Sequence, residues 1–514
     1  MQRKQLTLVI VSLLVVVLSV SLAWFTTQII GKGKNLNVSS ANLQIVFTDS
    51  DGALTETDIE PGWSATKTFT IKNDTKTEYK YNIVIKDLVN TFVTNGYLQY
   101  KITSTNNGYN MTEFKDIPKS SAPKDTILAY SVVIPNGVTQ SYTIEFKYAN
   151  DESVDQSDDM GKKLSGTLFI TEGTEPTLLT QLLADKSTVL TRTDFSTVLT
   201  NDNTNTLYTS TEDSKTVYYF AGNATDNWVK FGKNASNQDL YWRIIRTNSE
   251  GSIRLLYHGT STTATDAYIG KSAFNETYDD PMYVGYMYGT SGSLVNNRTN
   301  TTNSTIKGVI DTWYKNNLNT NYGKYISTTA VYCNDRSNPA GGYNTGKTSF
   351  NYGARTRLDT YKTPTYDCTD TNDKFTVDTS TGNGKLTYPI ALMTADEVSF
   401  AGGLYANYNA NAWYFRNAKE GTLTTSSSST DASYSSTGLT YWWLLSPFYW
   451  FGSSARASVF YVGGSSLPGF LGDYFVDGTR GVRPAVSLKS CVKTSGGDGS
   501  AGTPYTIEES TSGC

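Results

Sequence analysis

The sequence predicts a mainly β protein of two domains, a β-sandwich followed by a domain of mixed α and β structure. The chain has 514 residues, more than one domain usually holds. Apolar residues alternate in short segments through residues 36–172, which is the pattern of strands with one buried face. Beyond residue 215, amphipathic helices appear among the strand patterns. Hydrophobic residues make up 38% of the chain and aromatic residues 13%, enough to bury two cores.

The chain begins with a segment typical of exported proteins. Arg3 and Lys4 precede an almost unbroken apolar run at 6–25. Residues 1–30 are therefore predicted to be a signal peptide or a signal anchor, because the run is close to the length of a spanning helix. The basic flank places the N-terminus inside the cell in both cases. We expect an extracellular protein at the cell surface, held in the membrane by this segment or secreted after its cleavage.

Residues 36–172 are predicted to form the β-sandwich. Turn signals such as Asp51-Gly52 and Asn107-Gly108 separate the alternating segments. Several short strands with one apolar face favour two packed sheets. The alternating residues are Leu43, Ile45, Phe47, Phe69, Ile71, Tyr79, Tyr81, Ile83, Ile85, Leu98, Tyr100, Ile102, Tyr142, Ile144, Phe146 and Tyr148.

The order of features in this domain resembles the TasA and camelysin family of secreted fibre proteins. AWF stands at 23–25, NLNVSSANLQI at 35–45, IEPGWSATKTFTIKN at 59–73 and SGTLFI at 165–170. The resemblance implies a sandwich that assembles with copies of itself. A structural surface fibre is therefore one alternative function.

Residues 173–214 are predicted to be a linker with one short helix. Pro176 suits the first turn of a helix that carries Leu178, Leu179, Leu182 and Leu183. The stretch 197–214 is rich in Asn and Thr without periodicity, and it is predicted to be a loop.

Residues 215–514 are predicted to form the second domain. A hairpin joins strands at 242–245 and 253–256 through the turn at 248–251. Apolar residues at helical spacing predict a helix over 306–314, and a capping-box sequence begins another at Thr394.

Ordered blocks in the second domain resemble a family of bacterial surface domains built on the C-type lectin fold. YWWLLSP at 441–447 and GVRPAVSL at 481–488 match the family's WWLRSP-like opening and GVRPA-like close. The resemblance implies a C-type-lectin-like domain, related to formylglycine-generating oxidases and to variable proteins of diversity-generating retroelements. The sugar motifs of calcium-dependent lectins, EPN or QPD with WND, are missing. Further blocks are YYFAGNATDNWVKF at 218–231, YWRIIRTNSEGSIRLLYHGTS at 241–261, MYVGYMYGTSGSL at 282–294, IDTWYKNNL at 310–318, AVYCNDRS at 330–337, LMTADEVSFAGG at 392–403 and GDGSAGTPYTI at 497–507.

The segment between Pro447 and Asp477 mixes large aromatic residues with Gly and Ser, as binding loops do. For any single aromatic residue, packing in a core is the alternative. We expect the flanks, with Trp442, Trp443 and Arg483-Pro484, to be a buried frame whose substitution lowers stability. Substitution of the displayed residues should weaken binding instead. The predicted ligand-binding residues are Tyr449, Trp450, Ser453, Ser454, Phe460, Tyr461, Ser465, Ser466, Phe470, Asp473 and Tyr474.

The four cysteines fit export. The simplest of three connectivities pairs Cys333 with Cys368 and Cys491 with Cys514. No Cys-x-x-Cys or Cys/His cluster favours zinc, and Cys514 as the last residue fits a tail staple rather than a redox centre.

Composition and motifs weigh against several function classes. The formal charge is -4, and no long basic run follows the first residues, so we expect no nucleic-acid partner. His258 is the only histidine, which argues against His-based catalysis and His-rich zinc sites. Asp396 and Glu397 are adjacent acids, but Glu397 fits the capping box with Thr394. We expect no catalytic residue, no metal and no cofactor.

The leading expectation is a cell-surface adhesin or receptor that recognises a host or microbial protein or glycan. A fibre subunit assembling through the sandwich and an enzyme with a concave polar site stay open. A retroelement-diversified receptor is a special case of binding, which codons and a neighbouring reverse transcriptase would decide.

Overall fold

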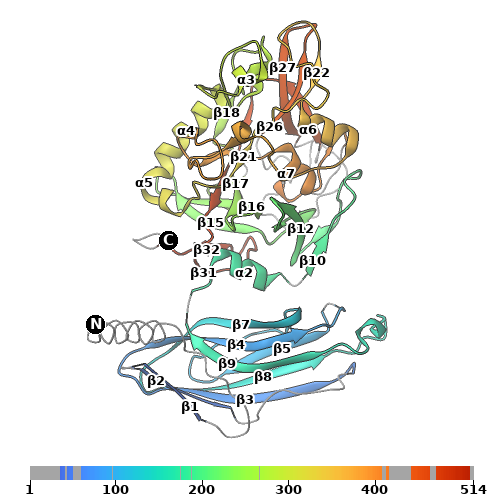
Figure 1. Ribbon diagram of the computed structural model, residues 1–514. Coiled ribbons are helices and arrows are strands. Elements are labelled where there is room, and N and C mark those ends of the chain that lie inside the picture. Colours follow the sequence, from blue (N-terminus) through green and yellow to red (C-terminus); the bar gives the residue numbers. More distant parts are fainter. Residues whose placement is uncertain are drawn as a thin grey trace, which may run out of the picture. The chain divides into compact units, whose positions relative to one another are not determined.

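A computed structural model describes residues 35–40, 43–49, 60–94, 96–173, 175–186, 188–264, 267–407, 412–415, 441–463, 470–509 and 514. The chain divides into two compact units, Met1–Glu175 and Pro176–Cys514 (Figure 1). The structure is mostly β with few helices, as the sequence predicts. The predicted signal segment lies outside the described residues, and none of the helices within the described ranges is long and apolar enough to cross a membrane.

The first unit consists of two sheets that share one core. A six-stranded sheet has the order β1-β2-β3-β8-β5-β6, and a three-stranded sheet has the order β7-β4-β9 (Figure 1). The core contains Ile71 and Ile144 of the first sheet with Ile83 and Leu168 of the second. The predicted alternation is thus confirmed at these strands. The strands are β1 (Asn35–Ser40), β2 (Leu43–Asp49), β3 (Ser64–Asn73), β4 (Tyr79–Asn90), β5 (Leu98–Ser104), β6 (Lys115–Asp116), β7 (Ser120–Ile134), β8 (Thr139–Tyr148) and β9 (Leu164–Glu172).

The second unit contains two large sheets around one extensive core. The ten-stranded sheet comprises β10 (Thr188–Thr191), β12 (Thr206–Glu212), β13 (Lys215–Tyr219), β15 (Trp228–Lys233), β16 (Asp239–Thr247), β17 (Ile253–Gly259), β24 (Ile390–Leu392), β30 (Pro484–Leu488), β31 (Thr494–Gly496) and β32 (Tyr505–Ile507). The seven-stranded sheet comprises β18 (Gly270–Ser272), β22 (Phe350–Asn351), β25 (Leu404–Tyr405), β26 (Tyr441–Phe451), β27 (Arg456–Gly463), β28 (Phe470–Phe475) and β29 (Arg480–Val482).

Short strand pairs and helices complete the second unit. The pairs are β11 (Asp202–Asn203) with β14 (Asn223–Ala224), β19 (Met287–Tyr288) with β20 (Thr302–Asn303), and β21 (Tyr332–Cys333) with β23 (Lys374–Phe375). The helices are α2 (Leu178–Asp185), α3 (Leu294–Asn297), α4 (Thr305–Asn317), α5 (Asn319–Tyr322), α6 (Gly353–Arg355) and α7 (Ala395–Phe400), with the π-helix η4 (Thr356–Tyr361).

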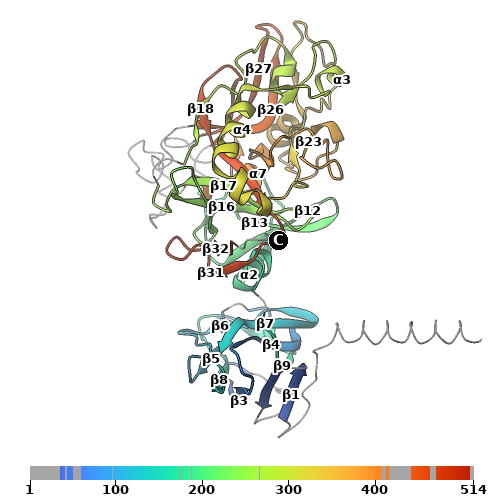
Figure 2. The same cartoon turned by 90° about the vertical axis from the view of Figure 1, so that its left-hand side faces the viewer.

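Local predictions for the second unit are confirmed. The helix α4 lies beside β18 (Figure 2) and buries Ile306, Ile310 and Tyr314 on one side. The strands β16 and β17 pair antiparallel through the predicted turn. The helix α7 begins with the predicted capping box, in which Thr394 and Glu397 bond reciprocally.

The prediction of a loop over 197–214 is wrong. Strand β12 lies in this stretch, where it pairs with β10 in parallel and with β13 antiparallel. Leu207 and Tyr208 are buried, whereas the Thr and Ser residues that follow are exposed or half-buried, which hides the alternation in the sequence. The predicted linker is therefore a linker only in part. Helix α2 is confirmed, but Pro176 lies before its N-cap and not in its first turn. The cap is Thr177, whose side chain accepts a hydrogen bond from the Thr180 amide.

Candidate functional site

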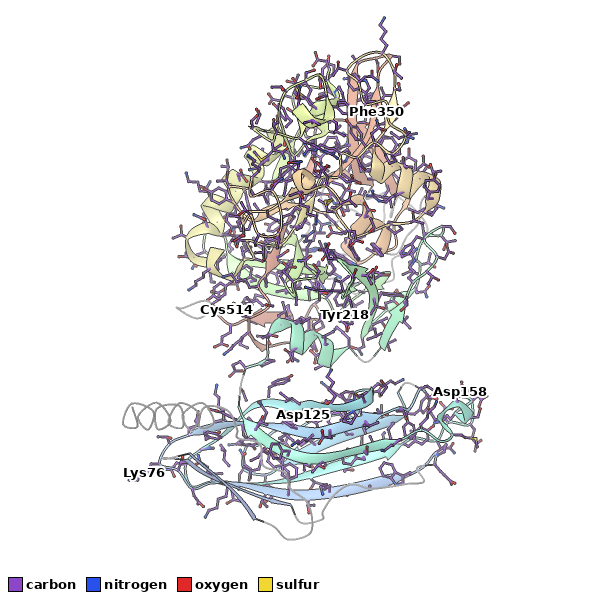
Figure 3. The ribbon with its side chains drawn as sticks, viewed as in Figure 1. Lys76, Asp125, Asp158, Tyr218, Phe350 and Cys514 are labelled. Carbon is purple, nitrogen blue, oxygen red and sulfur yellow. A yellow bond between two sulfur atoms is a disulfide. The ribbon has the colours of Figure 1, made fainter. Side chains whose placement is uncertain are left out.

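The segment predicted to form binding loops is mainly strand. Strands β26, β27 and β28 form an antiparallel meander, with Trp443 opposite Tyr461 and Tyr461 opposite Gly472. The β26–β27 turn lies near β22, whose Phe350 is labelled at this end of the unit in Figure 3. Ser453 and Ser454 are exposed in this turn, as predicted for display. Ser465 and Ser466 lie outside the described residues.

The flanks of the segment form a buried frame. Trp442, Trp443 and Arg483 are fully buried, and Pro484 is buried at the start of β30. The Trp443 indole donates to the Ser272 carbonyl at 2.9 Å. Arg483 donates to the backbone carbonyls of Tyr257 and Tyr414, so its charge is held by peptide dipoles. These interactions agree with the predicted role of the flanks.

Two predicted ligand-binding residues are core residues instead. Trp450 and Phe460 are fully buried. The Trp450 indole donates to the Gly346 carbonyl at 3.0 Å, and the Phe460 ring packs edge-on against Phe448 at 4.9 Å. Trp450 lies opposite Ala457, on the same face as Tyr461, whereas Phe460 lies opposite Asp473 on the other face, so both faces of the meander are covered at these positions. The prediction that both are displayed is therefore wrong.

One face of the meander carries a group of partly exposed aromatic side chains around one arginine. We call Tyr441, Tyr461, Phe470, Tyr474 and Arg480 the tyrosine patch. Residues 470, 472 and 474 share one face of β28, because alternate residues of a strand do so, and Tyr461 lies opposite Gly472. Tyr474 has 43% of its surface exposed, and the other members are half-buried.

The Arg480 guanidinium is surrounded by the rings of the patch. Its carbon lies 4.0 Å from the centre of the Tyr474 ring, 5.4 Å from Tyr441 and 5.7 Å from Tyr461. These distances are in the range of cation–π contacts. The rings therefore hold the guanidinium in one place on the face of the sheet.

Tyr449 and Asp473 lie on the other face of the meander. Asp473 is opposite Phe460, one residue from the patch position Tyr474, and Ser458 is opposite Tyr449. Tyr405 of β25 and Arg355 of α6 complete this group, which we call the Asp473 cluster. The Arg355 guanidinium lies 4.4 Å from the centre of the Tyr449 ring. The predicted site residues thus divide between two faces and do not form one site.

The Asp473 carboxyl has a pKa above its ordinary value. Burial raises its pKa to about 6, although Ser458 and Arg355 act in the opposite direction. Burial and the nearby Asp473 raise the pKa of Tyr405 to about 12. The cluster therefore holds a carboxyl that the fold stabilises poorly in its charged form.

Asp396 and Glu397 belong to ion pairs that the sequence does not reveal. Glu397 pairs with Arg246 at 2.9 Å and Arg254 at 2.8 Å, and all three side chains are nearly fully buried. Burial raises the pKa of Glu397, but Arg254 and Arg246 outweigh it and hold that pKa below its usual value. Asp396 pairs with Arg357 at 2.9 Å. The cavity beside these groups measures about 20 Å³, room for a water and not for a substrate.

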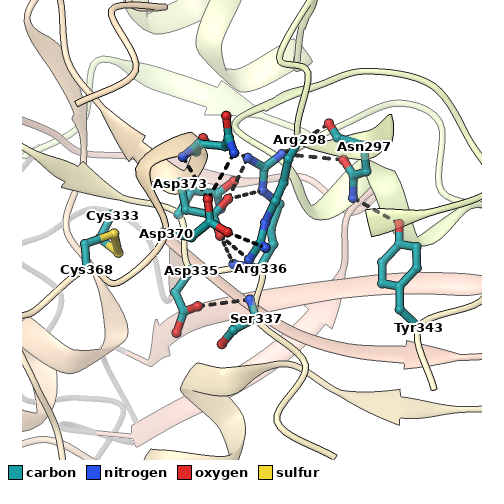
Figure 4. A network of polar contacts seen from close by, with 12 residues as sticks. Asn297, Arg298, Cys333, Asp335, Arg336, Ser337, Tyr343, Cys368, Asp370 and Asp373 are labelled. Carbon is teal, nitrogen blue, oxygen red and sulfur yellow. Dashed lines mark hydrogen bonds and ion pairs between the residues drawn. A yellow bond between two sulfur atoms is a disulfide. The ribbon is translucent and has the colours of Figure 1, made fainter. Parts of the chain in front are cut away.

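A polar network beside one disulfide fixes the loops around α3 and β21. Arg336 is fully buried and pairs with Asp373 at 2.6 Å, and Arg298 reaches the same carboxylate at 2.6 Å (Figure 4). The Cys333–Cys368 disulfide lies next to this network in Figure 4. The second disulfide joins Cys491 and Cys514, and no described cysteine is free. Both predicted linkages are confirmed.

The single histidine is a core residue. His258 is fully buried on β17, and neither ring nitrogen has a hydrogen-bond partner. Its ring meets Trp228 edge-on at 4.4 Å. Burial, with the charges of Arg483 and Arg243, holds the pKa of His258 well below its usual value. The ring is therefore neutral at physiological pH.

Residues 363–490, a range that contains the whole tyrosine patch, match a family model described as a domain of unknown function, DUF6273. No curated protein matches the sequence. A solved structure described as AvmM, which catalyses macrocyclization in alchivemycin A biosynthesis, is similar over 29% of this chain and 100% of its own length, at 10% identity. Its TM-score of 0.15 supports no statement about fold or activity.

Proposed function

We propose that the protein is an exported cell-surface protein that binds a protein or glycan ligand through the tyrosine patch of a C-type-lectin-like domain. The observation that carries this proposal is the patch itself. Its aromatic side chains are partly exposed although they stand on strands of fixed register, next to others that are fully buried. Rigid tyrosines supply contact area at low entropic cost, and they are enriched in binding surfaces.

The disulfides support the cellular location. Two linkages in one chain indicate an oxidising environment outside the cytoplasm. Residues 1–30 would then hold the chain at the membrane or be removed during secretion. A retroelement-diversified receptor is the special case in which codons for patch residues such as Tyr461 and Tyr474 match a template repeat.

Paired melting and binding measurements test the proposal. The full exported chain is applied to whole cells, mucin and a glycan array, as wild type and as Tyr461→Ala and Tyr474→Ala. We expect at least one variant to weaken binding by about 2 kcal/mol, roughly 30-fold, with little change in melting temperature. Tyr361→Ala is the matched control, because Tyr361 is 66% exposed on η4 outside the patch.

Two outcomes contradict the proposal. If the patch variants bind as the wild type does, the ligand contacts another surface. If the wild type binds none of the probes and instead polymerises, the fibre alternative is favoured.

A further inference from the structure

Arg480 differs from the other described arginines of the second unit in what surrounds its charge. Arg246, Arg254, Arg298, Arg336, Arg357 and Arg456 each lie within 3.0 Å of a carboxylate oxygen, and Arg355 lies 3.7 Å from Asp359. The buried Arg243 and Arg483 and the half-buried Arg192 donate to backbone carbonyls. Among the described residues, no carboxylate oxygen lies within 4.0 Å of Arg480.

The donors of Arg480 are largely unused. Its Nη1 donates to the Thr479 carbonyl at 2.9 Å, while its Nε has no hydrogen-bond partner. This Nε is shielded from solvent, so a ligand acceptor would reach the guanidinium through its Nη atoms. The surrounding tyrosine rings attract the cation but do not neutralise it.

The position of Arg480 is fixed before any ligand binds. Strand β29 lies between β18 and β26, with Arg480 opposite Ser272. The carbonyl of Ser272 is itself held by the indole of Trp443. A cation held in this way loses little conformational entropy on binding.

We propose that Arg480 binds the carboxylate of an acidic sugar, whose ring packs against Tyr441, Tyr461 and Tyr474. This inference rests on the proposed function and names the ligand class for the same patch. A planar guanidinium matches a carboxylate with two parallel hydrogen bonds. The rings of Tyr441, Tyr461 and Tyr474 offer flat apolar surface and hydroxyl groups. Both suit a sugar ring, which carries C–H and O–H groups in alternation.

The sheet topology favours a sugar over an acidic peptide. Extended peptides commonly bind by adding a strand to a free sheet edge. At the patch, β29 has β18 and β26 as neighbours, and β28 has β27 along one side, whereas β25 covers its other side only at Phe470 and Leu471. The guanidinium and the rings lie on the face of the paired strands and not along the part of β28 that β25 leaves uncovered.

The test uses glycans that end in glucuronic, galacturonic or sialic acid, each paired with its carboxyl-reduced form, and poly-glutamate as the acidic peptide. We expect the wild-type chain to bind at least one acidic glycan and to lose about 10-fold or more in affinity on carboxyl reduction. Arg480→Gln should cause a similar loss, and Arg480→Lys a smaller one. Arg456→Gln is the matched control, since Arg456 lies on the same sheet but pairs with Asp477 at 2.7 Å.

The outcomes separate this inference from the proposed function. Equal binding of acidic and reduced glycans, or of wild type and Arg480→Gln, overturns the acidic sugar while Tyr474-dependent binding still supports the patch. Binding of poly-glutamate alone also overturns it. If no probe binds, both proposals fail. The comparison of acidic with reduced glycans needs only the wild-type chain, so poor folding of a variant does not weaken the test.

Discussion

Replacing Asp473 with asparagine should stabilise the second unit at neutral pH. The folded-state pKa of about 6 lies above the ordinary value of 3.8, so the fold favours the protonated carboxyl. The difference corresponds to about 3 kcal/mol. Below pH 3.8 the carboxyl is protonated in both states and its stabilising contribution is complete. As the pH rises from about 4 to 6 that contribution is lost, because only the unfolded chain ionises freely.

Asparagine has nearly the same shape and does not ionise. Asp473→Asn should therefore raise the free energy of unfolding by up to about 3 kcal/mol at pH 7.5 and by about 0.5 kcal/mol at pH 4. Urea titrations followed by tryptophan fluorescence measure this. Most of the tryptophans lie in the second unit, namely Trp228, Trp242, Trp313, Trp413, Trp442, Trp443 and Trp450.

Asp279→Asn is the control, because Asp279 is an exposed aspartate for which we expect a change below about 0.5 kcal/mol. A destabilising Asp473→Asn, or a gain that is equal at pH 4 and 7.5, would refute the reasoning. A confirmed gain would mean that the chain retains a carboxylate at a cost in stability, as functional residues often do.

Three further substitutions test the framework of the second unit in urea unfolding. Glu397→Gln should lower the free energy of unfolding by about 3–5 kcal/mol, because Arg246 and Arg254 lose a charged buried partner. A decrease near 1 kcal/mol would show that Glu397 stabilises the fold only through the helix cap. Replacing both Cys333 and Cys368 with Ala should lower the free energy of unfolding by about 4 kcal/mol, because the disulfide restricts a loop of 35 residues in the unfolded chain. An unchanged urea midpoint would contradict this. His258 is neutral in the fold, so the free energy of unfolding should fall by up to about 1.4 kcal/mol for each pH unit below pH 6.5, where the unfolded chain binds a proton at this residue. In His258→Phe the pH dependence should be weaker by the contribution of about one proton.

Sequence reasoning succeeded where the determining contacts are local. The capping box of α7 spans four consecutive residues, and the β16–β17 hairpin is set by one turn. The cysteine pairs were predictable because four cysteines allow three connectivities and two of them cross long stretches of chain. Glu397 shows the limit of such reasoning. Its cap is local, but its partners Arg246 and Arg254 lie 151 and 143 residues away.

The predicted ligand-binding residues failed in part because β26 is irregular. The pairing of β26 with β27 shifts between Trp443 and Pro447 and again between Pro447 and Tyr449. The first shift sets four residues of β26 against two of β27 and leaves the faces unchanged. The second sets two against one, so Trp450 lies on the opposite face from Trp442 and counting by twos misplaces it. The Gly and Ser residues near Trp450 and Phe460 predict loops. Glycine has another role in this meander, because a side chain at Gly472 would collide with the rings of Phe470 and Tyr461.

Adjacent residues of β28 point to opposite faces of the meander. The Asp473 cluster and the tyrosine patch can therefore be altered by separate substitutions. Asp473 belongs to the Asp473 cluster and Tyr474 to the tyrosine patch, since neighbouring side chains of a strand point to opposite faces. If Arg480 and the tyrosines alone bind the ligand, Asp473→Asn should change the pH dependence of stability and leave affinity unaltered. Tyr474→Ala should do the reverse. The double variant should then show the two effects added within about 0.5 kcal/mol, and a larger coupling would mean that one ligand contacts both faces or that binding reshapes β28 itself.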